Sequence, residues 1–310
     1  MIVIVAPGQG SQTPGFLGPW VAEPRFRSHL ERLSDAAQLD LVAHGTESDA
    51  DTIRDTSVAQ PLIVAAGLLT LGAILEGDRE HDGHVDVAGI AGHSVGEITA
   101  AVGARVLTEH DAMVLVRERG KAMAAAASAV RTGMSAVLGA DEEELLPTLD
   151  ALGLSPANFN GGGQIVVAGE LEALDRLKAA PPAGARVIPL QVAGAFHTRY
   201  MEPAVERLRE VASGLTVANP RIELWTNRDG SAVADGAQFL ELLVGQVSSP
   251  VRWDRCMESF ASEGVTGIIE LAPAGALVGL AKRALKGVPA VAVKTPDDLP
   301  AALKLIEDNA

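Results

Sequence analysis

Gly92-His93-Ser94-Val95-Gly96-Glu97 is the stretch that decides how the whole chain is interpreted. The apolar run 87–91 before it is typical of a buried strand, and we expect residues 98–107 after it to form a helix. In that context Gly-x-Ser-x-Gly is the pattern of a nucleophile elbow, where glycines allow close packing around a strained serine. It predicts that Ser94 is a nucleophile at a helix N-terminus, whose free N–H groups can stabilise an oxyanion. The alternative for this motif alone is an ordinary turn with a capping serine.

Composition and charge limit the possible functions. With 310 residues, 47% of them hydrophobic, the chain can bury a substantial core in one large domain or two unequal ones. Its 40 acidic and 25 basic residues give a net charge of −15, which disfavours binding to nucleic acid. Cys256 is the only cysteine, so no internal disulfide is possible and we expect a cytoplasmic protein. Residues 1–6 lack the basic start of a signal peptide, and we interpret them as a first strand.

Two segments raise the question of a membrane or a metal. Residues 56–75 carry no charge and are long enough to span a bilayer. Polar residues, glycine and proline dilute the run and no aromatic anchors flank it, so we predict a buried core helix and no membrane. His81 and His84 are spaced like metal ligands, but no cysteine or third histidine lies nearby. We therefore expect a solvated loop there and no metal site.

The polar turn Pro7-Gly8-Gln9-Gly10-Ser11-Gln12 follows the first predicted strand. Ligands bind at the carboxyl ends of strands in an α/β sheet, so the turn is either a ligand contact or an ordinary tight turn. It lacks the lysine of a P-loop, which argues against a phosphate-binding loop. We expect helices over residues 22–36 and 57–76 between this turn and the elbow.

Arg119 lies on a further predicted helix, over residues 109–127, which begins with a capping box at Thr108. Helical spacing places it on one stripe with the mostly apolar residues Ala112, Val116, Gly120 and Met123. A guanidinium on such a stripe needs an anionic partner, because an unpaired buried charge is very costly. That partner is either a ligand or a protein carboxylate in a structural salt bridge, and the pattern leaves both open.

The segment from Gly133 to Leu190 has a different pattern, with predicted elements in the order βαββαβ. These are strand 134–138, helix 142–152, strands 156–159 and 164–168, helix 171–178 and strand 186–190. The order is that of a ferredoxin-like module inserted into a larger domain. Beyond it we expect a helix over 200–212, a turn at 246–253 leading into another helix, strand 267–271, helix 274–285 and strand 291–294.

Over essentially its whole length the chain resembles the malonyl-CoA:acyl carrier protein transacylases. The resemblance is carried, in order, by Pro7 to Gln12, Gly92 to Glu97, Arg119-Gly120 with Met123, Asn160 with Gln164, and Gly194-Ala195-Phe196-His197. It implies an α/β fold, with an α/β-hydrolase-like large domain formed by residues 1–124 and 192–310. A small ferredoxin-like domain, residues 125–191, would be inserted in it, with the active site in the cleft between the two.

The resemblance also implies a reaction. Ser94 would attack malonyl-CoA to form a malonyl ester, and the phosphopantetheine thiol of an acyl carrier protein would then take the malonyl group. His197 would be the general base, and the backbone N–H groups of Gln9 and Val95 would form the oxyanion hole. Coenzyme A and phosphopantetheine thioesters would be substrates, and no cofactor is implied.

Further roles follow from the same resemblance. A backbone carbonyl near Gln246 would orient His197 in place of an aspartate. A Ser-His-Asp triad would need an acid beside His197, but Asp141, Asp150 and Asp175 all lie in the inserted module, which favours a Ser-His dyad. Arg119 would bind the malonyl carboxylate, which its guanidinium matches in charge and geometry. The acyl pocket would be formed by Met123, Asn160, Gln164 and Phe196, although Asn160 and Gln164 could also be polar groups of a turn and a strand.

Some features stay open at this stage. Where the family often has Gly-Pro-Gly after a glutamate, this chain has Glu270-Leu-Ala-Pro-Ala-Gly275, at no catalytic position. Lys282, Arg283 and Lys286 are either a docking patch for an acidic carrier protein or a complement to a helix C-terminus. A serine thioesterase or esterase and a silent carrier-binding scaffold are the competing functions. We expect a monomer, and the sequence leaves fatty-acid and polyketide synthesis equally open.

Overall fold

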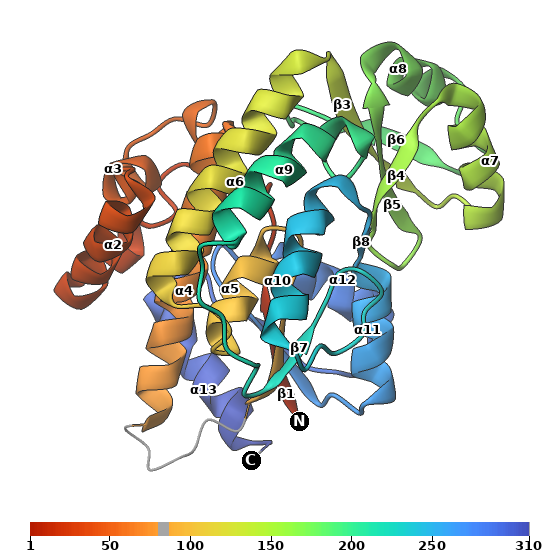
Figure 1. The fold of residues 1–310 in the computed structure, drawn as a ribbon. Coiled ribbons are helices and arrows are strands. Elements are labelled where there is room, and N and C mark those ends of the chain that lie inside the picture. The colour runs from red at the N-terminus through yellow and green to blue at the C-terminus, as the bar shows by residue number, and fades with distance from the viewer. Residues whose placement is uncertain (80–86, 310) are drawn as a thin grey trace.

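The computed structural model describes residues 1–79 and 87–309, which form two β-sheets with helices packed around them (Figure 1). The larger sheet has the strand order β10-β9-β1-β2-β7, and all neighbouring strands in it are parallel. Its strands are β1 (Ile2–Ala6), β2 (Val87–Gly92), β7 (Glu223–Trp225), β9 (Gly267–Glu270) and β10 (Ala290–Ala292). The central strands are apolar and buried, as expected of a parallel sheet covered by helices on both faces.

Helices flank this sheet on both sides. The helices of this larger part of the chain are α1 (Gly18–Val21), α2 (Pro24–Ala37), α3 (Leu41–Thr46), α4 (Thr56–Arg79), α5 (Gly96–Gly103), α6 (Glu109–Ala129), α9 (Glu202–Ala212), α10 (Gly236–Gly245), α11 (Trp253–Ser262), α12 (Ala276–Ala284) and α13 (Leu299–Glu307). Of these, α2 and α3 pack on other helices and not directly on the sheet. By length and composition α4 could cross a membrane, but 83% of its most apolar window is buried inside the protein, as expected of a core helix.

The smaller sheet has the strand order β6-β3-β5-β4-β8 and lies at the upper right of Figure 1. Its elements are β3 (Thr132–Leu138), α7 (Glu142–Leu152), β4 (Ser155–Phe159), β5 (Gln164–Glu170), α8 (Leu171–Ala179) and β6 (Arg186–Pro189). The predicted βαββαβ order is therefore confirmed, and the pairs β6-β3, β3-β5 and β5-β4 are antiparallel. The helices pack on one face over a core of their own that includes Val137, Leu149 and Leu177.

The two parts are more interleaved than the predicted domain limits suggest. Strand β8 (Val251–Arg252) comes from the second half of the predicted large domain, yet it pairs in parallel with β4. The predicted limit between residues 124 and 125 falls inside α6. The domain limits stay a prediction, while the mixed architecture with a ferredoxin-like small sheet is the observed fold.

Several predicted helix limits differ from the structure. Helix α5 begins at Gly96, inside the elbow, and ends at Gly103 rather than at residue 107. Its early end coincides with Arg105, whose φ of 65° is left-handed and cannot continue a right-handed helix. Helix α9 begins only at Glu202, because the 3₁₀ turn Arg199–Met201 precedes it.

Candidate active site

Ser94 lies on a sharp turn between β2 and α5, with a left-handed φ of 54°. The glycines around it are required by close backbone approach. A Cβ at Gly92 would lie 2.0 Å from the carbonyl carbon of Gly96, and one at Gly96 would lie 2.2 Å from the Ala6 carbonyl oxygen. The turn is therefore the strand-turn-helix elbow that the sequence pattern predicts.

His197 faces the Ser94 hydroxyl. Its Nε2 lies 2.7 Å from Ser94 Oγ, and its Nδ1 lies 2.9 Å from the backbone carbonyl oxygen of Gln246. A carbonyl oxygen only accepts hydrogen bonds, so Nδ1 carries the proton and Nε2 is free to accept from the serine. His197 also has a left-handed φ, 62°, and its backbone N–H donates to the Val247 carbonyl at 3.0 Å.

Burial controls the charge of His197. Desolvation, together with the nearby charge of Arg119, lowers the pKa of His197 to about 3, although the bond to the Gln246 carbonyl opposes this shift. The imidazole is therefore neutral at physiological pH. A neutral imidazole with a free Nε2 is the form that a general base requires.

Two backbone N–H groups are available next to Ser94. Gln9 and Val95 both line the same cavity, and within residues 1–79 and 87–309 neither of their backbone N–H groups has a hydrogen-bond partner. The two segments are held together, since the His93 N–H donates to the Ala6 carbonyl at 2.9 Å. This arrangement can stabilise a developing oxyanion without rearrangement.

Arg119 is buried behind the serine. Its Nη1 donates to Gln60 Oε1 and its Nη2 to Gln246 Oε1, each at 2.8 Å, and Nη2 lies 3.4 Å from Ser94 Oγ. Burial lowers the pKa of Arg119 only to about 10, so the group stays charged. In the described part of the chain no carboxylate lies within 4 Å of this guanidinium, and its Nε has no partner. The direct salt bridge that the sequence left open is therefore not formed there.

A cavity of about 690 Å³ opens over Ser94, between the carboxyl ends of β1 and β2 and the small sheet. The four predicted acyl-pocket residues all line it, namely Met123, Asn160, Gln164 and Phe196. Asn160 also accepts a hydrogen bond from His93 Nε2 at 3.0 Å, and Gln164 accepts one from Arg283 Nη2 at 3.2 Å. The structure thus brings most of the predicted site residues together around one cavity. Arg119 and Gln246 do not line the cavity but are buried behind Ser94 and His197, and the individual roles stay predictions.

Comparison with known proteins agrees with this geometry. Residues 3–297 match the family described as acyl transferase domain. The chain belongs to this family. It is 48% identical over 303 residues to the malonyl CoA-acyl carrier protein transacylase of Mycobacterium bovis, covering 96% of this chain and 98% of the relative.

Solved structures extend the comparison of this acyltransferase. The crystal structure of the corresponding enzyme from Mycobacterium tuberculosis has a TM-score of 0.93 at 48% identity and covers 98% of this chain and 99% of that one. A malonyl-transacylase in complex with a type II polyketide synthase acyl carrier protein has a TM-score of 0.90 at 32% identity, covering 98% and 99%. The resemblance to malonyl-CoA:acyl carrier protein transacylases and the predicted fold class are confirmed.

The acyltransferase site also contains Asn227, a residue for which no role was predicted. Its Oδ1 accepts from the Ser94 N–H and its Nδ2 donates to the Gly92 carbonyl, each at 2.7 Å. It follows β7, the neighbour of β2, at the carboxyl end of the strand. Its position just after a strand was the available signal, because such ends gather functional groups in parallel sheets.

No role was predicted for Glu97 either, nor for Gln60, which accepts the hydrogen bond from Arg119 Nη1. Glu97 is buried, and its two carboxylate oxygens accept from the Asn227 backbone N–H, at 2.5 Å, and from Gln246 Nε2. Burial raises the pKa of Glu97 to about 8, against the opposing effects of these donors and of Arg119. The available signal was that Glu97 ends the motif Gly92 to Glu97, but an acidic residue is also ordinary in a first helical turn.

Among the residues that the structure describes, no group of three or more His, Cys, Asp or Glu side chains could hold a metal ion. His81 and His84, the histidines spaced like metal ligands, lie outside the described residues. The predicted absence of a metal and of a cofactor therefore stays a prediction.

Proposed function

We propose that this protein transfers malonyl from malonyl-CoA to the phosphopantetheine thiol of an acyl carrier protein, through a malonyl ester of Ser94. Relatives with this activity in their names match almost the whole chain. The observation that carries the acyl specificity is Arg119, a buried guanidinium 3.4 Å from Ser94 Oγ that has no carboxylate partner in residues 1–79 and 87–309.

In the first half-reaction the Ser94 hydroxyl passes its proton to His197 Nε2 while Oγ attacks the thioester carbon. The carbonyl oxygen becomes an oxyanion, held by the backbone N–H groups of Gln9 and Val95. When the carbon–sulfur bond breaks, the coenzyme A thiolate takes the proton from His197. The products are coenzyme A and malonyl-Ser94.

In the second half-reaction the phosphopantetheine thiol gives its proton to His197 and attacks the ester carbon. The ester bond breaks, Ser94 recovers the proton, and malonyl leaves on the carrier protein. No step uses a metal or a resident cofactor. We propose that the protein works as a cytoplasmic monomer, as its sequence predicts.

Arg119 supplies the preference for malonyl over acetyl. A hydrogen bond to a charged group is worth about 1.5–3 kcal/mol net, or about a tenfold to hundredfold preference. The free carboxylate of malonyl can pair with the Arg119 guanidinium, whereas acetyl has no anionic group that could do so. Phe196 and Met123 narrow the same cavity against larger acyl groups.

The test is the intact mass of the protein after mixing with malonyl-CoA alone, beside a Ser94→Ala control. We expect one malonyl adduct on the unmodified protein and none on the variant. Addition of holo acyl carrier protein should then remove the adduct. Release of coenzyme A without an adduct would instead indicate a hydrolase, and neither adduct nor release would indicate a scaffold.

A further inference from the structure

The side chain of Gln246 joins two buried ionisable groups that do not touch each other directly. Its Nε2 donates to Glu97 Oε2, and its Oε1 accepts from Arg119 Nη2 at 2.8 Å. All three residues are buried. The mechanism above uses only the backbone carbonyl of Gln246, so it gives no function to this side chain or to Glu97.

The chemistry of the three groups fixes the direction of this chain of hydrogen bonds. An ionised carboxylate only accepts hydrogen bonds and a guanidinium only donates them. The Gln246 amide satisfies both only with its NH₂ toward Glu97 and its oxygen toward Arg119. Gln246 Nε2 also donates to the Ser94 carbonyl at 3.1 Å, so the ionised carboxylate and this carbonyl together hold the amide in the orientation that gives Arg119 an acceptor.

The other oxygen of Glu97 acts on the elbow. It accepts the Asn227 backbone N–H at 2.5 Å, and the Asn227 side chain holds the Ser94 N–H and the Gly92 carbonyl. Glu97 therefore contacts both Asn227, which binds the Ser94 backbone, and Gln246, which binds Arg119.

We propose that Glu97 is a positioning residue for malonyl selectivity, which holds Arg119 beside Ser94 by fixing the orientation of the Gln246 side-chain amide. The inference rests on the proposed function, because only an acyl group with a free carboxylate needs Arg119. Acetyl transfer uses the same serine, histidine and oxyanion hole without it.

The pH dependence provides a test on the unmodified protein. Burial raises the pKa of Glu97 to about 8, so a proton occupies the carboxyl increasingly as the pH falls, and the resulting O–H no longer fixes the amide. Of the titratable groups around it, His197 and Arg119 keep their main charge state between about pH 6.5 and 9. Burial lowers the pKa of His197 to about 3 and that of Arg119 only to about 10. It also lowers the pKa of His93 and raises the pKa of Cys256 well above its ordinary value. The ratio of malonyl to acetyl acylation should therefore rise with pH.

The variant that tests the proposal is Glu97→Gln, measured at pH 9. An amide at this position can accept or donate, so it no longer fixes the Gln246 amide, whose NH₂ then keeps only the weaker restraint of the Ser94 carbonyl. We expect the ratio of kcat/KM for malonyl-CoA to that for acetyl-CoA to fall about tenfold, the loss of one charged hydrogen bond, with acetyl acylation changed less than about threefold. The ratio in the variant should also be independent of pH.

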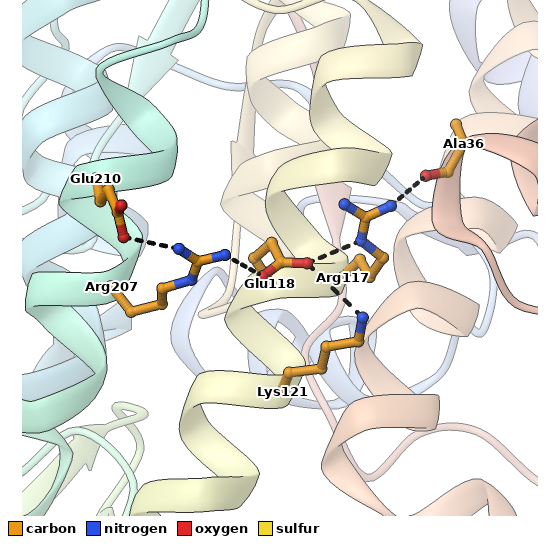
Figure 2. Close-up of polar contacts among 6 residues, drawn as sticks. All are labelled: Ala36, Arg117, Glu118, Lys121, Arg207 and Glu210. Atoms are coloured by element: carbon orange, nitrogen blue, oxygen red, sulfur yellow. Dashed lines mark hydrogen bonds and ion pairs between the residues drawn. The ribbon is translucent and has the colours of Figure 1, made fainter.

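The matched control is Glu118→Gln, at the position before Arg119 on α6. Figure 2 shows that Glu118 forms ion pairs with Arg117, Lys121 and Arg207, away from the cavity. We expect this variant to keep the wild-type ratio and its pH dependence.

The outcomes are distinct. If the unmodified protein forms no malonyl adduct, the proposed function fails. If it forms the adduct but Glu97→Gln keeps the wild-type ratio, or loses malonyl and acetyl acylation equally, the inference about Glu97 is wrong. Should Glu97→Gln not fold, the unmodified protein decides, because a ratio that stays flat from pH 6.5 to 9 would overturn the inference.

Discussion

At the scale of a single residue, we expect Arg119 to determine which acyl group the protein accepts. We predict that Arg119→Ala lowers kcat/KM for malonyl-CoA by about tenfold to a hundredfold, because a charged hydrogen bond is lost. Acetyl-CoA should become a relatively better substrate, since its acylation does not use the guanidinium. Measuring kcat/KM for both thioesters tests this, and an unchanged preference would remove Arg119 from the carboxylate-binding role.

Phe196 is the residue that we expect to limit the size of the acyl group. It is buried and lines the cavity directly before His197. We predict that Phe196→Ser relaxes the exclusion of methylmalonyl-CoA, because the smaller side chain leaves room for an α-methyl group. Competition between malonyl-CoA and methylmalonyl-CoA measures the effect, and an unchanged product ratio would contradict this role.

The protonation of His197 gives a prediction without a mutation. Since burial lowers its pKa to about 3, the imidazole stays unprotonated as the pH falls from 8 to 5. An ordinary histidine would lose most of its free base around pH 6.5. We predict that acylation of Ser94 by acetyl-CoA, which avoids Arg119, keeps its rate over this range in rapid-quench experiments. A half-maximal rate near pH 6.5 would show that His197 titrates normally.

At the scale of elements, the elbow depends on how closely β1, β2 and α5 pack. A Cβ at Gly96 would lie 2.2 Å from a backbone oxygen at the end of β1, so strand or helix would have to move. We predict that Gly96→Ala lowers the free energy of unfolding by about 1–3 kcal/mol or more, the usual cost of overpacking, and slows acylation of Ser94.

Gly279→Ala is the control for that variant. A Cβ at Gly279, within α12, would meet no atom of residues 1–79 and 87–309 within 4 Å, so alanine should be neutral or stabilise the helix. Urea unfolding of both variants gives the comparison. Equal stability of the two would show that the elbow tolerates a side chain.

Helices also connect the site to the rest of the fold. The ion pairs of Glu118 join α6, which carries Arg119, to Arg207 on α9, and Arg117 donates to the Ala36 carbonyl at the end of α2 (Figure 2). Partly exposed pairs of this kind contribute about 0–1 kcal/mol each. They tie neighbouring helices together, while the buried amide and carboxylate network sets the geometry of the site.

At the scale of the whole molecule, the cavity lies between the two sheets. The hydrogen bond from His93 to Asn160 crosses it at 3.0 Å and joins the elbow to the small sheet. We predict that Asn160→Ala lowers the free energy of unfolding by about 1–3 kcal/mol, because a half-buried ring nitrogen loses its acceptor. Gln164→Ala, which removes only an exposed partner of Arg283, should cost less in the same urea measurement.

Much of this architecture was predictable because it is encoded locally. Alternation of strands and helices, the βαββαβ order and the elbow each depend on patterns a few residues long. The limits of α5 were less predictable, since nothing nearby in sequence indicates the left-handed conformation of Arg105. The roles of Ser94, His197 and Arg119 came from the resemblance, and the structure places both His197 and Arg119 within hydrogen-bonding reach of the Ser94 hydroxyl.

By itself, the sequence determined the fold class and the chemical groups of the site, because short-range patterns and an ordered set of motifs carry that information. Only the tertiary structure decided which groups support them. Asn227 lies 133 positions from Ser94, and Gln246 lies 149 positions from Glu97. The addition of β8 to the small sheet is a long-range pairing of the same kind. Buried hydrogen bonds between such distant residues depend on how the elements pack, and no local sequence pattern predicts that packing.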